Sequence, residues 1–410
     1  MRNSLLIYCL GLLLASSGCA IADESASGDY GLTYDLTLDN AGNVNVILKV
    51  NQNAGQLKRL TLRTVDQGLT AFSENLQRQP DGSLLWITPT DGGEISWRGS
   101  ANQQRQDGSW SAKGGADWAV FRVEDVLPPI ASVTTPGADS RTRMHIKAPT
   151  GWPIVTAYPG DNGHFSVEDR GRRFDRPDGW ILAGNIGVRR DTIAGIRVAI
   201  AAPRGQSARR LDAMAFLNWH LPLIDALFDD FPDRFVIAMA GDPFFRGGLS
   251  APNSLFLHTD RPLVSGNGTS TLLHELFHAG LSRSAADGAD WIVEGLAEFY
   301  SQQWLFEAGS VTERRHLATL TTLRQWGRPT TTLKASRSAG ATTARAVTVF
   351  ATLDQEIRQS SKQRKTLDDV VRILDLSEDP LTLNVLRDAA SEVLGQPART
   401  LQSGELPGYD

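Results

Sequence analysis

The stretch TLLHELFHAGLSRSAADGADWIVEGLAEFY, residues 271–300, decides the fold because it reads as two helices separated by a polar break. Apolar residues recur at helical spacing on both sides of the break, and Gly288 within it permits the chain to turn. His274 and His278 stand four residues apart in the first helix. At that spacing both imidazoles project from one helix face, about one turn apart.

This pattern predicts a zinc site. Two imidazole nitrogens on one helix face can meet one Zn²⁺ at roughly 2.0–2.1 Å, and a catalytic zinc needs a third protein ligand. Glu294 can supply that ligand from the second helix, with Glu298 one turn further on to orient a histidine ligand. Glu275, beside the first histidine, is placed to act as the general base.

A simpler interpretation of the same residues stays open. The segment could be a buried helix whose histidines are satisfied by hydrogen bonds to Glu294 and Glu298, without any metal. The spaced acidic pair on a second helix favours the metal site over this interpretation, and one Zn²⁺ per chain is expected.

Composition describes an ordinary globular protein. The chain has 410 residues, of which 41% are hydrophobic and 21% are charged, and its formal net charge is −5. This length predicts two or three domains. No long Lys/Arg run is present, so neither nucleic acid nor an anionic membrane is expected as a partner.

The N-terminus resembles a secretory signal peptide of residues 1–22. A short basic start precedes an apolar run at 5–15, and the small residues around Ile21 predict cleavage after Ala22. A competing lipoprotein site at Cys19 stays open, and a lipid there would be the sole membrane link. Both cysteines, Cys9 and Cys19, lie in this segment, so the mature chain has no thiol to bind metal. We expect export to a bacterial periplasm or cell surface.

The hydrophobic pattern of the remaining chain changes twice along the sequence. Residues 23–195 alternate apolar and polar positions between turn signals, which predicts an N-terminal β domain, an antiparallel sandwich or saddle. Residues 196–310 mix helices and strands around the histidines and predict the zinc catalytic domain, including one glycine-rich strand at 246–258. Residues 311–410 predict a C-terminal helical region. The fold class expected is therefore α+β with several domains.

These motifs resemble the gluzincin metallopeptidases, especially the glycyl aminopeptidase family and more distantly the aminopeptidase N family. HELFH at 274–278 is similar to their zinc helix, and WIVEG at 291–295 is similar to their third-ligand motif. RGGLSAPNSLFLH at 246–258 resembles their substrate-binding edge strand. The resemblance implies a thermolysin-like catalytic core, with Gly247, Gly248, Leu249 and Ser250 as the residues that bind the substrate backbone.

Two positions depart from the family pattern. Ser250 stands where these aminopeptidases have a glutamate that pairs with the substrate amine, which favours internal cleavage or an unusual substrate over strict exopeptidase action. Thr343 stands where they have a tyrosine that donates to the oxyanion, and Arg345 and His316 are the substitutes considered.

The function expected is that of an exported zinc metallopeptidase acting on peptides or proteins, with a zinc-activated water and Glu275 as general base. Whether it cleaves at chain ends or internally is left open. The alternative is a catalytically degenerate zinc-binding protein that serves as a periplasmic binding or scaffold module.

Overall fold

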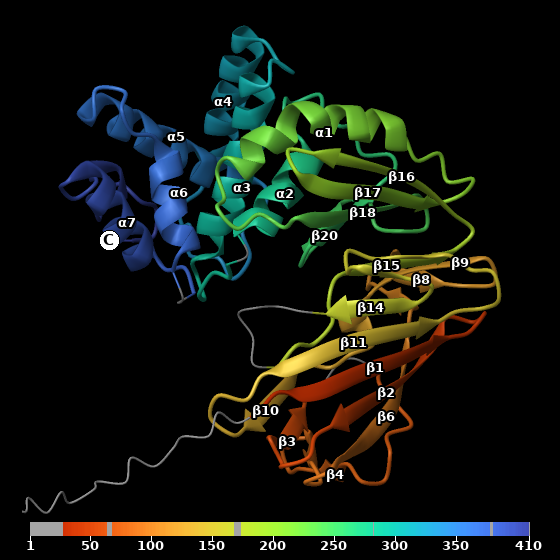
Figure 1. Cartoon of the computed structure of the whole chain (residues 1–410). Coiled ribbons are helices and arrows are strands. Elements are labelled where there is room, and N and C mark those ends of the chain that lie inside the picture. Colours follow the sequence, from red (N-terminus) through yellow and green to blue (C-terminus); the bar gives the residue numbers. More distant parts are fainter. Residues whose placement is uncertain (1–27, 64–67, 168–173, 282, 378–379, 410) are drawn as a thin grey trace, which may run out of the picture.

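The computed structural model of the chain describes residues 28–63, 68–167, 174–281, 283–377 and 380–409 (Figure 1). The expected signal peptide, with Cys9 and Cys19, lies outside the described residues. No helix among the described residues combines the length and the apolar character that crossing a bilayer requires.

A six-stranded sheet forms the centre of the N-terminal region. In spatial order it contains β13 (Gly160–Asp161), β14 (His164–Val167), β11 (Ser140–Lys147), β1 (Tyr30–Leu38), β2 (Asn43–Asn51) and β6 (Gly92–Ser100). Alternate residues of β1 are buried, as the period of two predicts. The pair β1–β11 is parallel, whereas the other pairs of this sheet are antiparallel.

Two smaller sheets pack with it around one apolar core. The first contains β10 (Ile130–Thr134), β3 (Leu57–Leu62), β5 (Leu84–Ile87) and β4 (Gln77–Arg78). The second contains β12 (Ile154–Val155), β15 (Trp180–Gly184), β9 (Trp118–Arg122), β8 (Trp110–Gly114) and β7 (Gln103–Gln104), with a 3-10 turn, η1 (Val123–Asp125), after β9. Trp180 of β15 packs its ring 5.2 Å from that of Phe256 and so joins this region to the next sheet.

The sheet that leads to the metal site contains, in order, β16 (Ile186–Ile193), β17 (Ile196–Pro203), β18 (Arg234–Ala240), β20 (Ser254–His258) and β19 (Gly248–Ala251). Strands β17, β18 and β20 are parallel, while β19 runs antiparallel at the edge. The segment expected as one glycine-rich strand is therefore a hairpin. It turns at Asn253, whose φ of 52° is in the left-handed region.

Helix α1 (Arg210–Asp225) covers this sheet, and the rest of the chain is helical. The remaining helices are α2 (Thr271–Leu281), α3 (Asp290–Glu307), α4 (Glu313–Gly327), α5 (Ala341–Ser360), α6 (Leu367–Asp375), α7 (Leu383–Leu394) and the 3-10 turn η2 (Arg399–Leu401). Threonine side chains cap the starts of three of them, at Thr312, Thr366 and Thr382. Helix α7 ends at Gly395, whose φ of 71° suits glycine.

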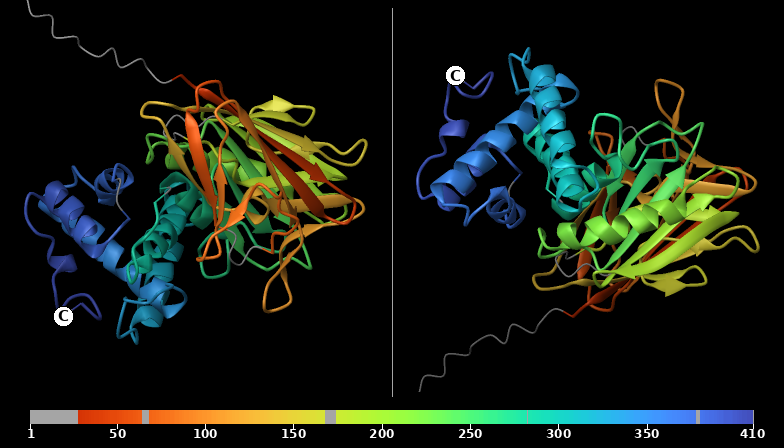
Figure 2. Two further views of the ribbon diagram at one scale, coloured as in Figure 1. Left: turned by 90° about the horizontal axis from the view of Figure 1, so that it is seen from below. Right: turned by 90° about the horizontal axis from the view of Figure 1, so that it is seen from above.

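One continuous apolar core runs from this sheet through α1 to α7. In every view the C-terminal helices lie to one side, away from the N-terminal strands (Figures 1 and 2). The predicted α+β class, with β sheets first and helices last, is confirmed. The exact domain boundaries expected from the sequence stay predictions.

Candidate metal centre

Helix α2 presents its two histidines because its other face is apolar. Leu272, Leu276 and Phe277 are fully buried, and the ring of Phe277 lies 5.1 Å from that of Tyr300 on α3. This packing holds α2 against α3. The side chains of His274 and His278 keep 17% and 15% of their surface exposed, and both lie close to Glu294.

Close packing also fixes the helix that carries Glu294. The buried Trp291 donates a hydrogen bond from Nε1 to Tyr409 Oη, 3.0 Å away, and its ring stacks on Phe350 of α5. A Cβ on Gly295 would lie only 2.5 Å from the Cβ of Ala346. Glycine therefore permits α3 to approach α5 closely at the position next to Glu294.

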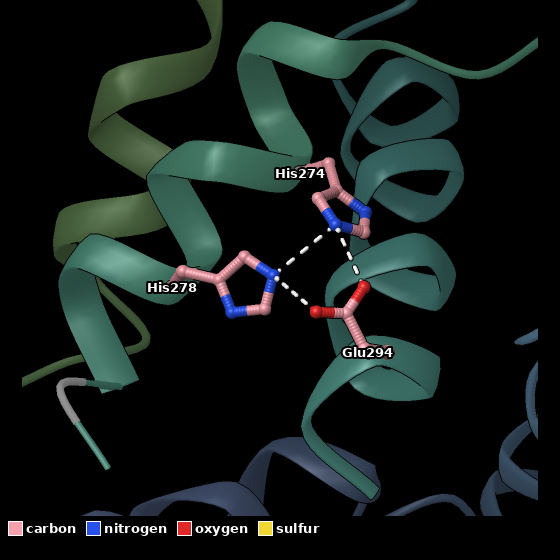
Figure 3. Close-up of side chains that lie close together, drawn as sticks. All are labelled: His274, His278 and Glu294. Carbon is pink, nitrogen blue, oxygen red and sulfur yellow. Dashed lines mark hydrogen bonds and ion pairs between the residues drawn. The ribbon is translucent and has the colours of Figure 1, made fainter. Parts of the chain in front are cut away.

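The three predicted ligands meet at one point (Figure 3). His274 Nε2 lies 3.1 Å from His278 Nε2 and 3.4 Å from Glu294 Oε2, and His278 Nε2 lies 3.5 Å from Glu294 Oε1. Ligands held at 2.0–2.1 Å from a tetrahedral zinc are separated from one another by about 3.3 Å. The donor set of two imidazoles and one carboxylate and the spacing of its atoms fit Zn²⁺, which favours the metal site over a metal-free hydrogen-bonded helix.

Glu298 lies beside His274, the first of the two histidines. Its Oε2 is 3.2 Å from His274 Nδ1, the ring nitrogen that faces away from the other two ligands. When Nε2 binds a metal, Nδ1 carries the proton and donates a hydrogen bond to Glu298 Oε2. That hydrogen bond fixes the tautomer and the orientation of the ring.

Without a metal, the triad retains a proton. Burial favours a neutral ring, but hydrogen bonds to Glu294 and Glu298 raise the pKa of His274 to about 10. Burial, together with the charge on His274, lowers the pKa of His278 to about 4. A metal that binds here at neutral pH must therefore displace one proton.

Glu275 lies next to His274 on α2 and contacts the edge strand. Its side chain is buried, and the backbone N–H of Ser250 donates to its Oε2 at 2.8 Å. Burial raises the pKa of this carboxyl, while the charge of His274 opposes the increase. A Cβ on Gly248 would lie 2.5 Å from Glu275 Cγ, so the glycine leaves the room that this carboxylate occupies.

The residues predicted to bind substrate lie at the start of this hairpin. Gly248, Leu249 and Ser250 belong to β19, and Gly247 directly precedes it. The carbonyl of Leu249 accepts a hydrogen bond from Trp180 Nε1, and the N–H of Ser250 is used by Glu275. Whether this strand binds substrate stays a prediction.

A cavity of about 350 Å³ adjoins the metal ligands, and sequence reasoning missed most of its wall. We call it the Arg337 cavity. The residues that line it are His274, Glu294, Glu298, Leu323, Trp326, Arg337, Ser338, Ala339, Gly340, Thr343 and Ala344. Thr343 was singled out in the sequence, whereas Arg337, Ser338 and Trp326 carry no motif that points to them.

The two substitutes considered for the oxyanion donor lie elsewhere. Arg345 lines a separate cavity between α5 and η2. His316 is buried in α4, where its ring stacks on Phe306 at 4.8 Å. Neither side chain belongs to the wall of the Arg337 cavity.

Comparisons with known proteins identify the fold. No protein-family model and no curated protein sequence matches the chain. An aminopeptidase N family protein from Idiomarina loihiensis is similar in structure, with a TM-score of 0.64 and 18% identity over 92% of this chain and 74% of the other. An M1 zinc metallopeptidase from Deinococcus radiodurans has a TM-score of 0.56 and 16% identity, over 92% and 91% of the two chains.

Two further structures extend this comparison. Native leukotriene A4 hydrolase from Saccharomyces cerevisiae has a TM-score of 0.53 and 15% identity, over 89% of this chain and 65% of its own. A mutant of the Deinococcus enzyme, with a TM-score of 0.55 and 16% identity over 92% of each chain, is bound to a Tyr-Ser-Ala substrate. The chain therefore has the fold of M1 zinc metallopeptidases, with a His-His-Glu triad that fits a zinc site.

Proposed function

We propose that this protein is a zinc-dependent peptidase exported from a bacterial cell. One observation carries the proposal: a triad with tetrahedral spacing stands next to Glu275, a buried carboxylate held on an edge strand. A structural zinc site would need the triad but not this carboxylate. The Deinococcus relative that binds a Tyr-Ser-Ala substrate supports peptides as the substrate class.

The residues of the chain divide the work. His274, His278 and Glu294 hold the metal, and Glu298 fixes the orientation of His274. Zinc, when bound, supplies a Lewis acid that polarises a carbonyl and makes water more acidic. Glu275 then accepts a proton from the attacking water at a carboxylate oxygen and passes it to the leaving amine.

The residue at position 250 of the edge strand indicates whether cleavage requires a free N-terminus. Ser250 in β19 has a hydroxyl where an aminopeptidase needs a carboxylate for the protonated amine, and its N–H is already bonded to Glu275. A neutral hydroxyl gives a much weaker partner for an ammonium than a carboxylate does. We therefore propose that the protein cleaves peptides without requiring a free N-terminus. On this proposal the chain shares its ancestry with the glycyl aminopeptidases but not their aminopeptidase activity.

A digest of a peptide library tests the proposal. The zinc-loaded mature protein, its Glu275→Gln variant and a matched control, Glu392→Gln on the exposed face of α7, are compared by mass spectrometry. We expect cleavage by the first and third proteins and a loss of about 10²–10⁴-fold in the Glu275 variant, with zinc affinity retained. Equal cleavage by all three proteins would refute the role of Glu275.

A second candidate is favoured by one observation. Among the described residues that line the Arg337 cavity there is no tyrosine, and the loss of one oxyanion donor commonly costs about 10²–10³ in kcat. The alternative is thus a zinc-binding periplasmic binding or scaffold protein. Peptide binding without cleavage by the zinc-loaded protein would select it. N-terminal mass spectrometry of the exported form would separate cleavage after Ala22 from lipidation at Cys19.

A further inference from the structure

Arg337 is the cation of the cavity beside the metal ligands. Its side chain is exposed to solvent, and no carboxylate among the described residues lies within ion-pair distance of it. The two carboxylates that share the cavity are already paired: Glu294 with both histidines and Glu298 with His274. Arg337 therefore has donors available for a ligand.

The loop that carries Arg337 is held in place. The N–H of the next residue, Ser338, donates to Asp290 Oδ2 at 2.6 Å, and Asp290 is the first residue of α3. The buried Ser338 hydroxyl also bonds to Thr343 Oγ1 at 3.0 Å. These bonds connect the loop to the helix of Glu294 and to the start of α5, so the backbone that carries Arg337 is anchored at the cavity that the metal ligands also line.

The charge of the cavity favours an anion. A Zn²⁺ held by two neutral imidazoles and one carboxylate retains a net charge of about +1, Arg337 adds one positive charge, and Glu298, which also lines the cavity, adds one negative charge. On the edge strand, Ser250 contributes a neutral hydroxyl and no further negative charge. With zinc bound, the cavity thus keeps a net charge of about +1, which favours a carboxylate over an amine.

The apolar wall suits the stem of such a ligand. The buried Leu323 and the residue Trp326, which is 51% exposed, belong to the last turns of α4 and line the same cavity as Arg337. An exposed tryptophan beside an unpaired arginine offers an apolar surface for methylene groups and a fork of donors for the carboxylate that ends them.

We propose that the Arg337 cavity is a carboxylate-recognition subsite, in which Arg337 binds an acidic side chain or the C-terminal carboxylate of a peptide held at the metal. This inference rests on the proposed function for the peptide class. It commits the chain to substrates that carry a carboxylate close to the metal-bound group.

Binding to a protein that cannot cleave provides the test. Zinc-loaded Glu275→Gln protein is titrated by calorimetry with three peptides of one backbone sequence: one with glutamate and an amidated C-terminus, one with glutamine and a free C-terminus, and one with glutamine and an amidated C-terminus. The first two peptides show whether the carboxylate that Arg337 binds belongs to a side chain or to the C-terminus. We expect at least one of them to bind about 10- to 100-fold more tightly than the third.

Variants of Arg337 then identify the cation. In the same background, Arg337→Gln removes that advantage and leaves the neutral peptide unaffected, Arg337→Lys retains part of it, and Arg324→Gln on the exposed face of α4 retains all of it. The subsite is refuted if neither carboxylate strengthens binding, or if Arg337→Gln weakens all three peptides equally. If the peptides with a carboxylate bind more tightly but the unmodified protein, which keeps Glu275, cleaves none of them, the subsite is supported and the peptidase proposal is refuted.

Discussion

Replacing Glu298 removes the hydrogen bond that His274 donates from Nδ1, the ring nitrogen away from the metal position. Its Oε2 lies 3.2 Å from His274 Nδ1, and 20% of the Glu298 side chain is exposed, so water only partly replaces the lost partner. Glu298→Ala leaves Nδ1–H without an acceptor. Glu298→Gln keeps a neutral acceptor but loses the charge that strengthens the bond.

The expected loss follows from the role of this carboxylate as a positioning residue. Groups that hold a metal-bound imidazole in this way are worth 10- to 100-fold in metal affinity, or about 1.4–2.8 kcal/mol. The alanine variant removes the whole interaction, so we expect about 100-fold weaker zinc binding. The glutamine variant retains the geometry, so we expect about tenfold.

Zinc affinity is measured by competition with a chromophoric chelator at pH 7.5, on the mature protein. Glu307→Gln is the matched control, because Glu307 is an exposed glutamate at the end of the same helix α3 and bonds to Gln303 rather than to a histidine. We expect the control to bind zinc as the unmodified protein does.

Two results would refute this reasoning. If Glu298→Ala binds zinc within about threefold of the unmodified protein, the hydrogen bond at 3.2 Å does not orient the ligand. If Glu307→Gln weakens zinc binding as much as Glu298→Gln does, the loss reflects a general change in α3 and not the partner of His274.

Three further predictions follow from packing and charge. Gly248→Val displaces Glu275, whose Cγ lies 2.5 Å from the added Cβ, so cleavage falls while zinc affinity in the chelator assay is unchanged. Gly295→Ala pushes α3 from α5 and lowers the free energy of unfolding by about 1–3 kcal/mol in urea titrations, because the clash with Ala346 outweighs the gain in helix propensity. Burial raises the pKa of Asp375 from 3.8 to about 6, so the stability this group contributes below pH 3.8 is lost as the pH rises through about 6. Asp375→Asn is therefore more stable than the unmodified protein at pH 8, by about 1–2 kcal/mol after discounting for partial exposure, and equal to it at pH 3; equal stability at both pH values would contradict this shift.

Features set by short-range spacing were predictable from the sequence. Alternation in β1 predicted its buried face, and the spacing of His274 and His278 predicted two imidazoles on one face of α2. Both predictions succeed because strand and helix periods are local, so a side chain's direction follows from its position in the element. Glu294 required the motif on α3 in addition, since spacing alone does not say how two helices pack.

Contacts between distant segments were not predictable. The bond from Ser250 N–H to Glu275 joins residues 25 apart, and that from Ser338 to Asp290 joins residues 48 apart. No periodic pattern specifies such pairs, because they depend on the packing of a sheet edge or a loop against a helix. The hairpin at Asn253 was missed for a related reason, since its turn interrupts a run that reads as one strand.

The candidate residues around the metal show most clearly what the sequence determines and what only the tertiary structure decides. The sequence alone determined a helix with two histidines and a following helix with two spaced glutamates. Only the tertiary structure decided that Thr343 faces the metal-side cavity while Arg345, two residues later on α5, faces another. The physical reason is that each helical residue rotates the side chain by about 100°, and which direction meets the metal is set by where α5 packs against α3.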